Sequence, residues 1–267
     1  MRNMLFLAVF LVACQPAAHH RDSGITIPEG RVIDLSHPYD QDTVYWPTAE
    51  GFELRVDSEG MTDKGYYYTA NTICSAEHGG THIDAPIHFA EGGNTVDEIP
   101  LEQLMGGALV IDVSQRCAGN PDYQVTVSDF ELWEAEHGTL PEGAIVLLRT
   151  GYEEFWPDRM RYMGTDELGP NAVAKLHFPG LDPGAARWLV ANRSINAIGL
   201  DTPSIDYGQS THFESHQVLF AADIPAFENL ANLRDLPPAC FVVVALPMKI
   251  AGGSGGPLRI AAIVPTD

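Results

Sequence analysis

Residues 77–89 read EHGGTHIDAPIHF and form the most informative segment of this chain. Three imidazoles and one carboxylate in this segment share even-numbered positions: His78, His82, Asp84 and His88. Side chains alternate faces along an extended strand, so this parity predicts that all four point to one side. A helix would turn Asp84 away from the first two histidines, and two glycines and Pro86 also oppose a helix. We therefore predict an extended segment that presents these four groups together.

These four groups are typical of a divalent-metal hydrolase site that keeps an open coordination position. A single histidine is usually a structural residue of the core or the surface. Four unpaired ionisable groups on one strand face are different, because they would repel one another or be costly to bury. The spacing therefore favours metal binding over a structural role.

The bulk composition indicates an ordinary folded protein that does not bind nucleic acid. The chain has 267 residues, which is enough for one large domain with a full hydrophobic core. Hydrophobic residues make up 45% and charged residues 19%, as in ordinary globular proteins. The net charge of −21 argues against nucleic-acid binding, because phosphate contacts need clustered Lys and Arg. We expect a small-molecule substrate and no nucleic-acid partner.

The N-terminus predicts export and a lipid anchor. Residues 4–12 form an apolar run that is too short to span a bilayer as a mature helix. The run ends in LVAC at 11–14, which resembles the cleavage box of bacterial lipoproteins, whose cysteine carries the lipid. We predict a lipoprotein-type signal over residues 1–14, lipidation at Cys14 and a tether over residues 15–30. The following Gln15, by resemblance, favours the outer membrane of a double-membrane bacterium, and we expect the protein on its periplasmic face; the alternative is an ordinary secretory signal.

Residues 31–267 are predicted to form a single catalytic domain of α/β class. Apolar runs bounded by turn residues predict buried strands at 31–35, 107–113, 144–149, 197–201, 240–246 and 258–264. One helix is predicted over 128–137, with Ser128 and Glu131 as a capping box. Another is predicted over 182–192, with Pro183 at its first position. Strands outnumber helices, so we expect a mixed sheet or barrel.

Other segments are further candidates for the site. Residues 45–48 read YWPT and are either a lid or substrate platform, or a turn packed on the core. Ser204 follows a predicted strand, where α/β proteins often place their sites. The Gly-rich segment 248–257 lacks the spacing of a phosphate loop and better fits a close backbone approach to the site, or a flexible turn. Three cysteines are predicted to be small buried hydrophobes: Cys74, Cys117 and Cys240.

Residues 78–89 resemble the signature of the bacterial cyclase family, which includes kynurenine formamidases and isatin hydrolases. The resemblance extends from VIDLS at 32–36 to GPLR at 256–259, nearly the whole predicted domain. It implies a swivelling β/β/α barrel-like fold with a mixed sheet, assembled as a homodimer or homotetramer. It also implies that Gly80 lets the backbone pass close to a metal.

The same resemblance implies roles for individual residues. Those that match the ligands of a first metal are His78, His82 and Asp84. His88 matches the catalytic histidine. His216 and Glu228, about which local spacing says little, match a downstream pair that helps to hold a second metal in the formamidases. The isatin hydrolases are similar but carry one manganese, so the resemblance implies one or two divalent ions, Mn²⁺ or Zn²⁺.

The implied activity is metal-dependent hydrolysis of a non-peptide C–N bond in an isatin-like ring or an N-formylkynurenine-like formamide. A metal-activated water would attack the carbonyl, with His88 as general base and then general acid. Trp46, Phe89 and Ser204 are predicted to contact the substrate. Two other classes stay open: a metal-dependent small-ligand-binding lipoprotein, and a cyclase or dehydratase. A free base beside the metal favours catalysis, because a passive binder has no use for one.

Overall fold

An eight-stranded mixed sheet forms the centre of the structure, a computed structural model that describes residues 29–266. The strand order is β1-β12-β11-β5-β7-β9-β10-β4, and β12 also pairs with β4, so all strands except β1 close into a barrel. The strands are β1 (Gly30–Asp34), β4 (His82–Asp84), β5 (Met105–Asp112), β7 (Ile145–Arg149), β9 (Ala197–Leu200), β10 (Ala226–Glu228), β11 (Phe241–Pro247) and β12 (Gly255–Pro265). Strands β5, β7, β9 and β10 run parallel to one another, and the other pairs are antiparallel.

The central strands are covered on both faces. In β7, Ile145 and Leu147 join a hydrophobic cluster that draws on every strand of the barrel and fills its interior. Their neighbours Val146 and Leu148 join a second cluster, which lies under the helices. Because both faces are buried, these strands are continuous apolar runs, as their sequences predicted.

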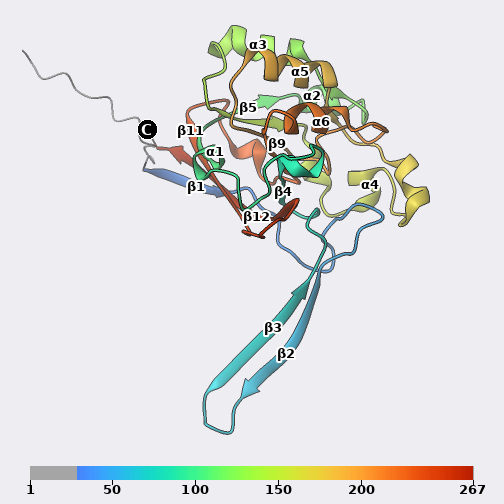
Figure 1. The fold of residues 1–267 in the computed structure, drawn as a ribbon, viewed down its shortest axis with the longest axis vertical. Helices are drawn as coiled ribbons and strands as arrows, with labels where there is room; N and C mark the ends of the chain where they lie inside the picture. Colours follow the sequence, from blue (N-terminus) through green and yellow to red (C-terminus); the bar gives the residue numbers. More distant parts are fainter. Residues whose placement is uncertain (1–28, 267) are drawn as a thin grey trace, which may run out of the picture.

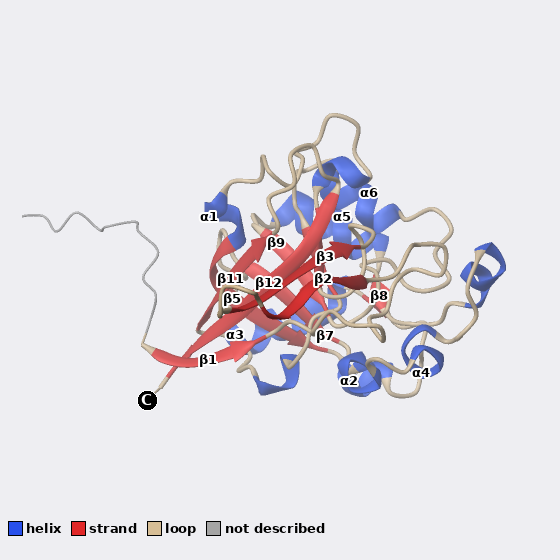
Figure 2. Ribbon diagram, turned by 90° about the horizontal axis from the view of Figure 1, so that it is seen from below, coloured by secondary structure: helices blue, strands red, loops and turns tan. Residues whose placement is uncertain are grey.

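Helices pack against the outer face of the barrel (Figure 1). The longer ones are α3 (Val127–His137), α5 (Pro183–Asn192) and α6 (Glu214–Phe220). Short helical segments and a second small sheet lie in the connections: α1 (Leu101–Leu104), α2 (Ser114–Cys117), α4 (Arg159–Met163), η1 (Pro86–His88), η2 (Tyr152–Phe155), η3 (Pro170–Lys175), η4 (Leu233–Asp235), β6 (Gln124–Val125) and β8 (Gly180–Leu181). Figure 2 shows strands at the centre and helices at the periphery.

Of the two longest helices, α5 begins where it was predicted to begin, and α3 does not. Helix α5 begins at Pro183, and the Asp182 carboxylate accepts a hydrogen bond from a backbone N–H in its first turn. The predicted cap of α3 is wrong by two residues. Thr126 and Asp129 form the capping box in place of Ser128 and Glu131, because Asp129 is buried and reaches back to the Thr126 backbone.

A two-stranded hairpin projects from the barrel and was not predicted. It consists of β2 (Glu53–Met61) and β3 (Tyr67–Cys74), paired antiparallel with a bulge near Val56, and it points away from the body (Figure 1). Nearly all of its side chains are exposed. Because these strands bury no face, they lack the apolar runs that mark the barrel strands. We call residues 53–74 the arm.

Of the remaining predictions about the fold, some are confirmed, some are wrong, and some concern residues outside the described range. The α/β barrel-like fold with a mixed sheet is confirmed, and all six predicted strands are present. Cys117 is buried, as predicted, whereas Cys74 and Cys240 are exposed because they lie on the arm and before β11. The predicted signal, Cys14 and most of the tether lie outside the described residues. Within residues 29–266, no helix has the length and apolar character needed to cross a bilayer.

Candidate metal centre

The segment around β4 is not the single extended strand that its spacing predicted. Only His82–Asp84 is a strand, and it pairs with β10 on one side and β12 on the other. The chain bends before it at Gly80, whose φ is 57°, and after it at Pro86, which starts a 3₁₀ turn that carries His88. His82 and Asp84 thus share a face through strand alternation, whereas the outer histidines reach the site through the bends.

Two glycines explain how closely the backbone packs here. A Cβ atom at Gly80 would lie 2.7 Å from the ring of Tyr39, so the packing of this ring requires glycine here. Gly255 makes the close approach predicted for the Gly-rich segment. A Cβ atom at Gly255 would lie 2.6 Å from the imidazole of His78, so β12 passes directly beside the site.

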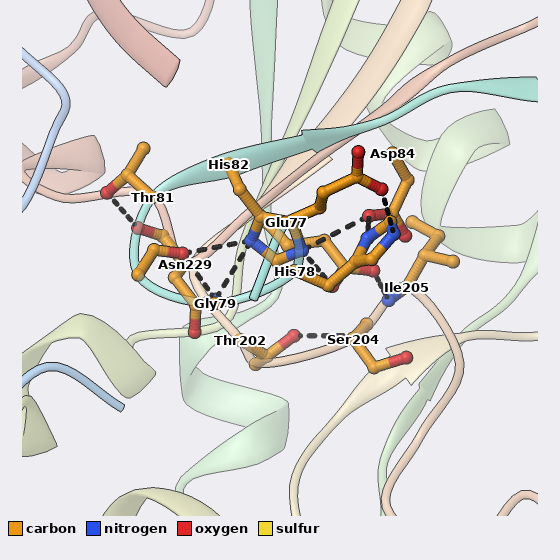
Figure 3. Close-up of polar contacts among 12 residues, drawn as sticks. Glu77, His78, Gly79, Thr81, His82, Asp84, Thr202, Ser204, Ile205 and Asn229 are labelled. Atoms are coloured by element: carbon orange, nitrogen blue, oxygen red, sulfur yellow. Dashed lines mark hydrogen bonds and ion pairs between the residues drawn. The ribbon is translucent and has the colours of Figure 1, made fainter. Parts of the chain in front are cut away.

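Asp84 joins two groups of candidate ligands, shown in part in Figure 3. Ligand atoms of His78, His82 and Asp84 lie within 4.8 Å of one another, and so do those of Asp84, His216 and Glu228. Asp84 Oδ1 lies 2.6 Å from His78 Nδ1 and 3.1 Å from His82 Nε2. Its Oδ2 lies 3.2 Å from His216 Nε2, which is 3.3 Å from Glu228 Oε1. The fold therefore brings together all five residues predicted to be ligands.

Two of the imidazoles are held through the ring nitrogen that points away from Asp84. His82 Nδ1 lies 2.9 Å from the carbonyl oxygen of Gly80. His216 Nδ1 lies 2.6 Å from a carboxylate oxygen of the buried Asp206. If Nδ1 donates to these acceptors, Nε2 carries the free lone pair and faces Asp84. Metal-ligating histidines are oriented in this way.

His78 is held by a longer chain of hydrogen bonds. Its Nε2 lies 2.9 Å from Ser254 Oγ, and Ser254 Oγ lies 2.6 Å from a carboxylate oxygen of Glu77. The backbone N–H of Ser254 donates to the same carboxylate. His78 Nδ1 is left facing Asp84, so each of the three imidazoles offers one nitrogen to the centre and anchors the other.

These anchoring residues had no predicted role. Asp206 lies in the polar stretch after β9, Ser254 in the Gly-rich segment, and Glu77 next to the first histidine. The segments that contain them were recognised in the sequence, but no local sequence pattern indicates which histidine each residue contacts. Only the pairing of β4 with β12 and the packing of α6 bring them to their partners.

The donor set fits a divalent cation. Asp84 and Glu228 are both buried, and none of the described residues that line the cavity is Lys or Arg. Burial and the negative charge of Asp84 raise the pKa of Glu228. Burial alone would raise the pKa of Asp84 too, but while the imidazoles carry protons, the charge of His78 and hydrogen bonds from the three histidines hold it well below its usual range. Buried carboxylates among imidazoles are ligands that Zn²⁺ and Mn²⁺ accept, and a bound cation would supply the positive charge in place of those protons.

His88 lies beside the centre but belongs to neither ligand group. Its ring stacks on the ring of His78, with the centroids 3.8 Å apart and the planes 18° apart. Burial and the neighbouring imidazoles lower the pKa of His88 to about 4, although Asp84 opposes the shift. The ring is therefore neutral at pH 7 and able to accept a proton.

A cavity of about 300 Å³ opens above the centre. The three residues predicted to contact substrate all line it: Trp46, Phe89 and Ser204. Phe213, which was not predicted, lies 5.4 Å from Phe89 and 6.3 Å from Trp46 between ring centroids. Within the YWPT segment, Tyr45 is buried, and Trp46 both packs on the core and lines the cavity.

Asp206→Asn is expected to weaken metal binding about 10–100-fold, the usual cost of losing a carboxylate that orients a ligating histidine. Titration with Mn²⁺ or Zn²⁺ would measure the change. Asp122→Asn is the matched control, because Asp122 lies 2.9 Å from His177 Nδ1 in a pair outside the site. Equal affinity in the Asp206 variant and the wild type would show that this carboxylate does not act through His216.

Comparison with known proteins agrees with this geometry. The family model "Cyclase" matches residues 33–207. The isatin hydrolase of Roseibium aggregatum is 30% identical over 252 residues, covering 91% of this chain and 90% of the relative. The kynurenine formamidase of Salinibacter ruber is 26% identical, covering 85% and 95%.

Solved structures agree as well. Isatin hydrolase A from Labrenzia aggregata, bound to benzyl benzoate, superposes with a TM-score of 0.79 at 34% identity, covering 88% of this chain and 94% of that chain. An isatin hydrolase bound to the product analogue thioisatinate gives a TM-score of 0.78 at 30% identity, covering 89% and 94%. Given the extent of the match, the barrel and the clustered histidines and carboxylates of the motif, this chain belongs to the cyclase family of metal-dependent hydrolases.

Proposed function

We propose that the protein is a metal-dependent amidohydrolase that opens the ring of an isatin-like cyclic amide. The observation that carries this proposal is the position of His88, stacked on His78 beside the ligand groups and outside both of them. A site that only bound a ligand would need the donors but not an additional base. The similarity to isatin hydrolases, at 30% identity in sequence and a TM-score of 0.79 in structure, favours the ring amide over the formamide.

Different residues of the chain bind the ion, transfer the proton and hold the substrate. Five side chains hold the ion or ions: His78, His82, Asp84, His216 and Glu228. When bound, a divalent ion supplies a water of lowered pKa and a positive charge for the carbonyl oxygen. His88 takes a proton as the water attacks the carbonyl carbon and returns it to the nitrogen as the C–N bond breaks. Trp46 and Phe89 hold the aromatic part of the substrate in the cavity.

The proposal is tested with the chain lacking residues 1–14, which retains all of the described fold. The protein would be purified without chelator, loaded with Mn²⁺ or Zn²⁺, and assayed by absorbance with isatin and with N-formylkynurenine. Faster turnover of isatin supports the proposal, and faster turnover of N-formylkynurenine assigns an arylformamidase instead. Bound metal without turnover of either would favour a ligand-binding protein, and a product that has lost water would favour a cyclase or dehydratase.

Trp46→Ala is expected to raise KM for isatin about tenfold, with a smaller change in kcat, because it removes an aromatic wall of the cavity. Steady-state kinetics would separate the two constants. Trp188→Ala is the control, since Trp188 lies on α5, away from the cavity, and stacks under Arg193. An unchanged KM in the Trp46 variant would remove this residue from the substrate-binding wall.

We further propose that the protein is exported and held on the periplasmic face of the outer membrane by a lipid on Cys14. The supporting observation is the short apolar run that ends in LVAC. Fractionation of bacteria that express the full chain or the chain lacking residues 1–14 tests this. The full chain is expected with the membranes, and its recovery in the soluble fraction would contradict the anchor.

A further inference from the structure

Asn229 lies where the two segments that carry the candidate ligands meet. It directly follows Glu228 at the end of β10, and Glu228 pairs with His82 at the start of β4. Asn229 is buried, and its φ of 54° places its backbone in the left-handed region. A non-glycine residue keeps this conformation only when its surroundings hold it there, although asparagine tolerates it better than most.

The side-chain amide of Asn229 is bonded at both ends. Its Nδ2 donates to the carbonyl oxygen of Gly80 at 2.8 Å, and its Oδ1 lies 2.9 Å from the hydroxyl of Tyr162. The same hydroxyl lies 3.1 Å from the backbone oxygen of Asp201, a longer contact. A carbonyl oxygen can only accept, so the contact with Gly80 fixes which end of the amide is the nitrogen. Because Tyr162 belongs to the cluster under the helices, the amide ties the bend at Gly80 to the core.

The carbonyl oxygen that Asn229 holds is the one that orients His82. Gly80 O lies 2.9 Å from His82 Nδ1, and its two lone pairs can accept from this nitrogen and from Asn229 together. The direct contact between the two side chains is longer, at 3.5 Å, so the shared carbonyl is the stronger link. The direction of this carbonyl keeps the proton on Nδ1 and turns Nε2 of His82 toward Asp84.

The backbone of Asn229 holds the next residue of the same bend. Thr81 Oγ1 donates to the carbonyl oxygen of Asn229 at 2.7 Å and accepts from the backbone N–H of His37 at 2.8 Å. The N–H of Asn229 donates to the carbonyl oxygen of Thr202 at 3.0 Å. Figure 3 shows Asn229 beside Thr81 and His82. Asn229 thus contacts both residues that immediately precede His82, while it immediately follows Glu228.

We propose that Asn229 is a positioning residue of the metal centre. It locks the segment of His82 to the segment of Glu228 and, through the carbonyl of Gly80, fixes the orientation and the protonated nitrogen of His82. The inference rests on the proposed function only in that the centre must bind a divalent ion. Without the amide, the bend at Gly80 loses its tie to the core, and His82 can turn or move its proton.

Two asparagines three residues apart provide a matched test. Asn229 and Asn232 have φ angles of 54° and 57°, and each donates a hydrogen bond of 2.8 Å from Nδ2 to a backbone carbonyl. Asn232 bonds to Asp34, is exposed and lies outside both ligand groups. Glycine adopts such φ angles without strain, so Asn229→Gly and Asn232→Gly each remove one side chain and keep the backbone conformation.

The measurement uses the chain lacking residues 1–14, loaded with Zn²⁺ and labelled with ¹⁵N in its histidines. In the wild type and in Asn232→Gly, NMR is expected to show a proton on His82 Nδ1 that exchanges slowly with water, because this nitrogen is buried and bonded. In Asn229→Gly the proton should exchange rapidly, and the dissociation constant for Zn²⁺ should rise about tenfold. Tyr162→Phe keeps the ring but frees one end of the amide, so it should move both readouts the same way by less.

Two outcomes would overturn this inference alone. Asn229→Gly could keep the slow proton and the affinity of the wild type, or Asn232→Gly could weaken Zn²⁺ binding equally, which would indicate general loosening of the fold. If Asn229→Gly does not fold by circular dichroism, unchanged readouts in Tyr162→Phe overturn it. A wild type that binds no divalent ion would contradict the metal centre and this inference together. None of these measurements depends on turnover, so the hydrolase activity can fail while the role of Asn229 holds.

Discussion

Asp84→Asn is expected to abolish both metal binding and turnover. Among the described residues, Asp84 alone belongs to both ligand groups, and its two carboxylate oxygens face three different histidines. The amide removes the negative charge and can present only one oxygen. The loss of affinity should therefore exceed the 10–100-fold that is typical when an outer residue of a metal site is removed. Metal content by mass spectrometry and turnover of isatin would measure both effects.

Asp201→Asn is the matched control for this substitution. Asp201 is also fully buried and accepts hydrogen bonds from Thr150 and Gly151, but it lies outside both ligand groups. Losing these charge-assisted bonds should lower the melting temperature while metal content stays the same. If both variants lost metal equally, general unfolding would explain the result, and Asp84 would need no special role.

His88→Gln is expected to lower kcat about 10²–10⁴-fold while the protein keeps its full metal content. Glutamine fills similar space in the stack on His78 but cannot accept a proton at neutral pH. Because burial holds the pKa of His88 at about 4, the wild-type ring is neutral and competent as a base at pH 7. Loss of metal from the variant would instead indicate that His88 is a ligand. An unchanged kcat would exclude His88 as the base.

His37→Gln controls for the loss of a buried, stacked histidine. His37 stacks on Trp156 with ring centroids 4.1 Å apart, and burial lowers its pKa to about 4 as well. It does not line the cavity. We expect a change in stability without a change in kcat, so that any large effect at His88 reflects its place beside the metal centre and not its burial.

The parts of the fold that could be predicted are those with strong local patterns. Strands covered on both faces must be apolar throughout, so β5, β7 and β9 were visible as runs. Strands β11 and β12 were also visible as apolar runs, although they bury one face fully and the other only in part. Spacing also identified the first candidate ligands. It did so partly for the wrong reason, because strand parity holds for His82 and Asp84 and the outer histidines arrive through a glycine bend and a proline turn.

The rest of the site depends on contacts that no local pattern contains. His216 meets Asp84 across 132 residues of chain, and Glu228 is placed by the pairing of β10 with β4. Resemblance to a family indicated both, but residue spacing alone could not. Asp206 and Ser254 went unassigned for the same reason. The arm was missed because its strands bury no face within the described chain, and burial is what makes a strand pattern readable.

The arm can change in length without changing the spacing of the segments beside it. Its ends are held together by the pairing of Glu53 with Cys74, so the distance between the segments that precede and follow it does not depend on its length. Deletion or insertion of paired residues near the tip would change what the arm can reach without moving Trp46 or His78.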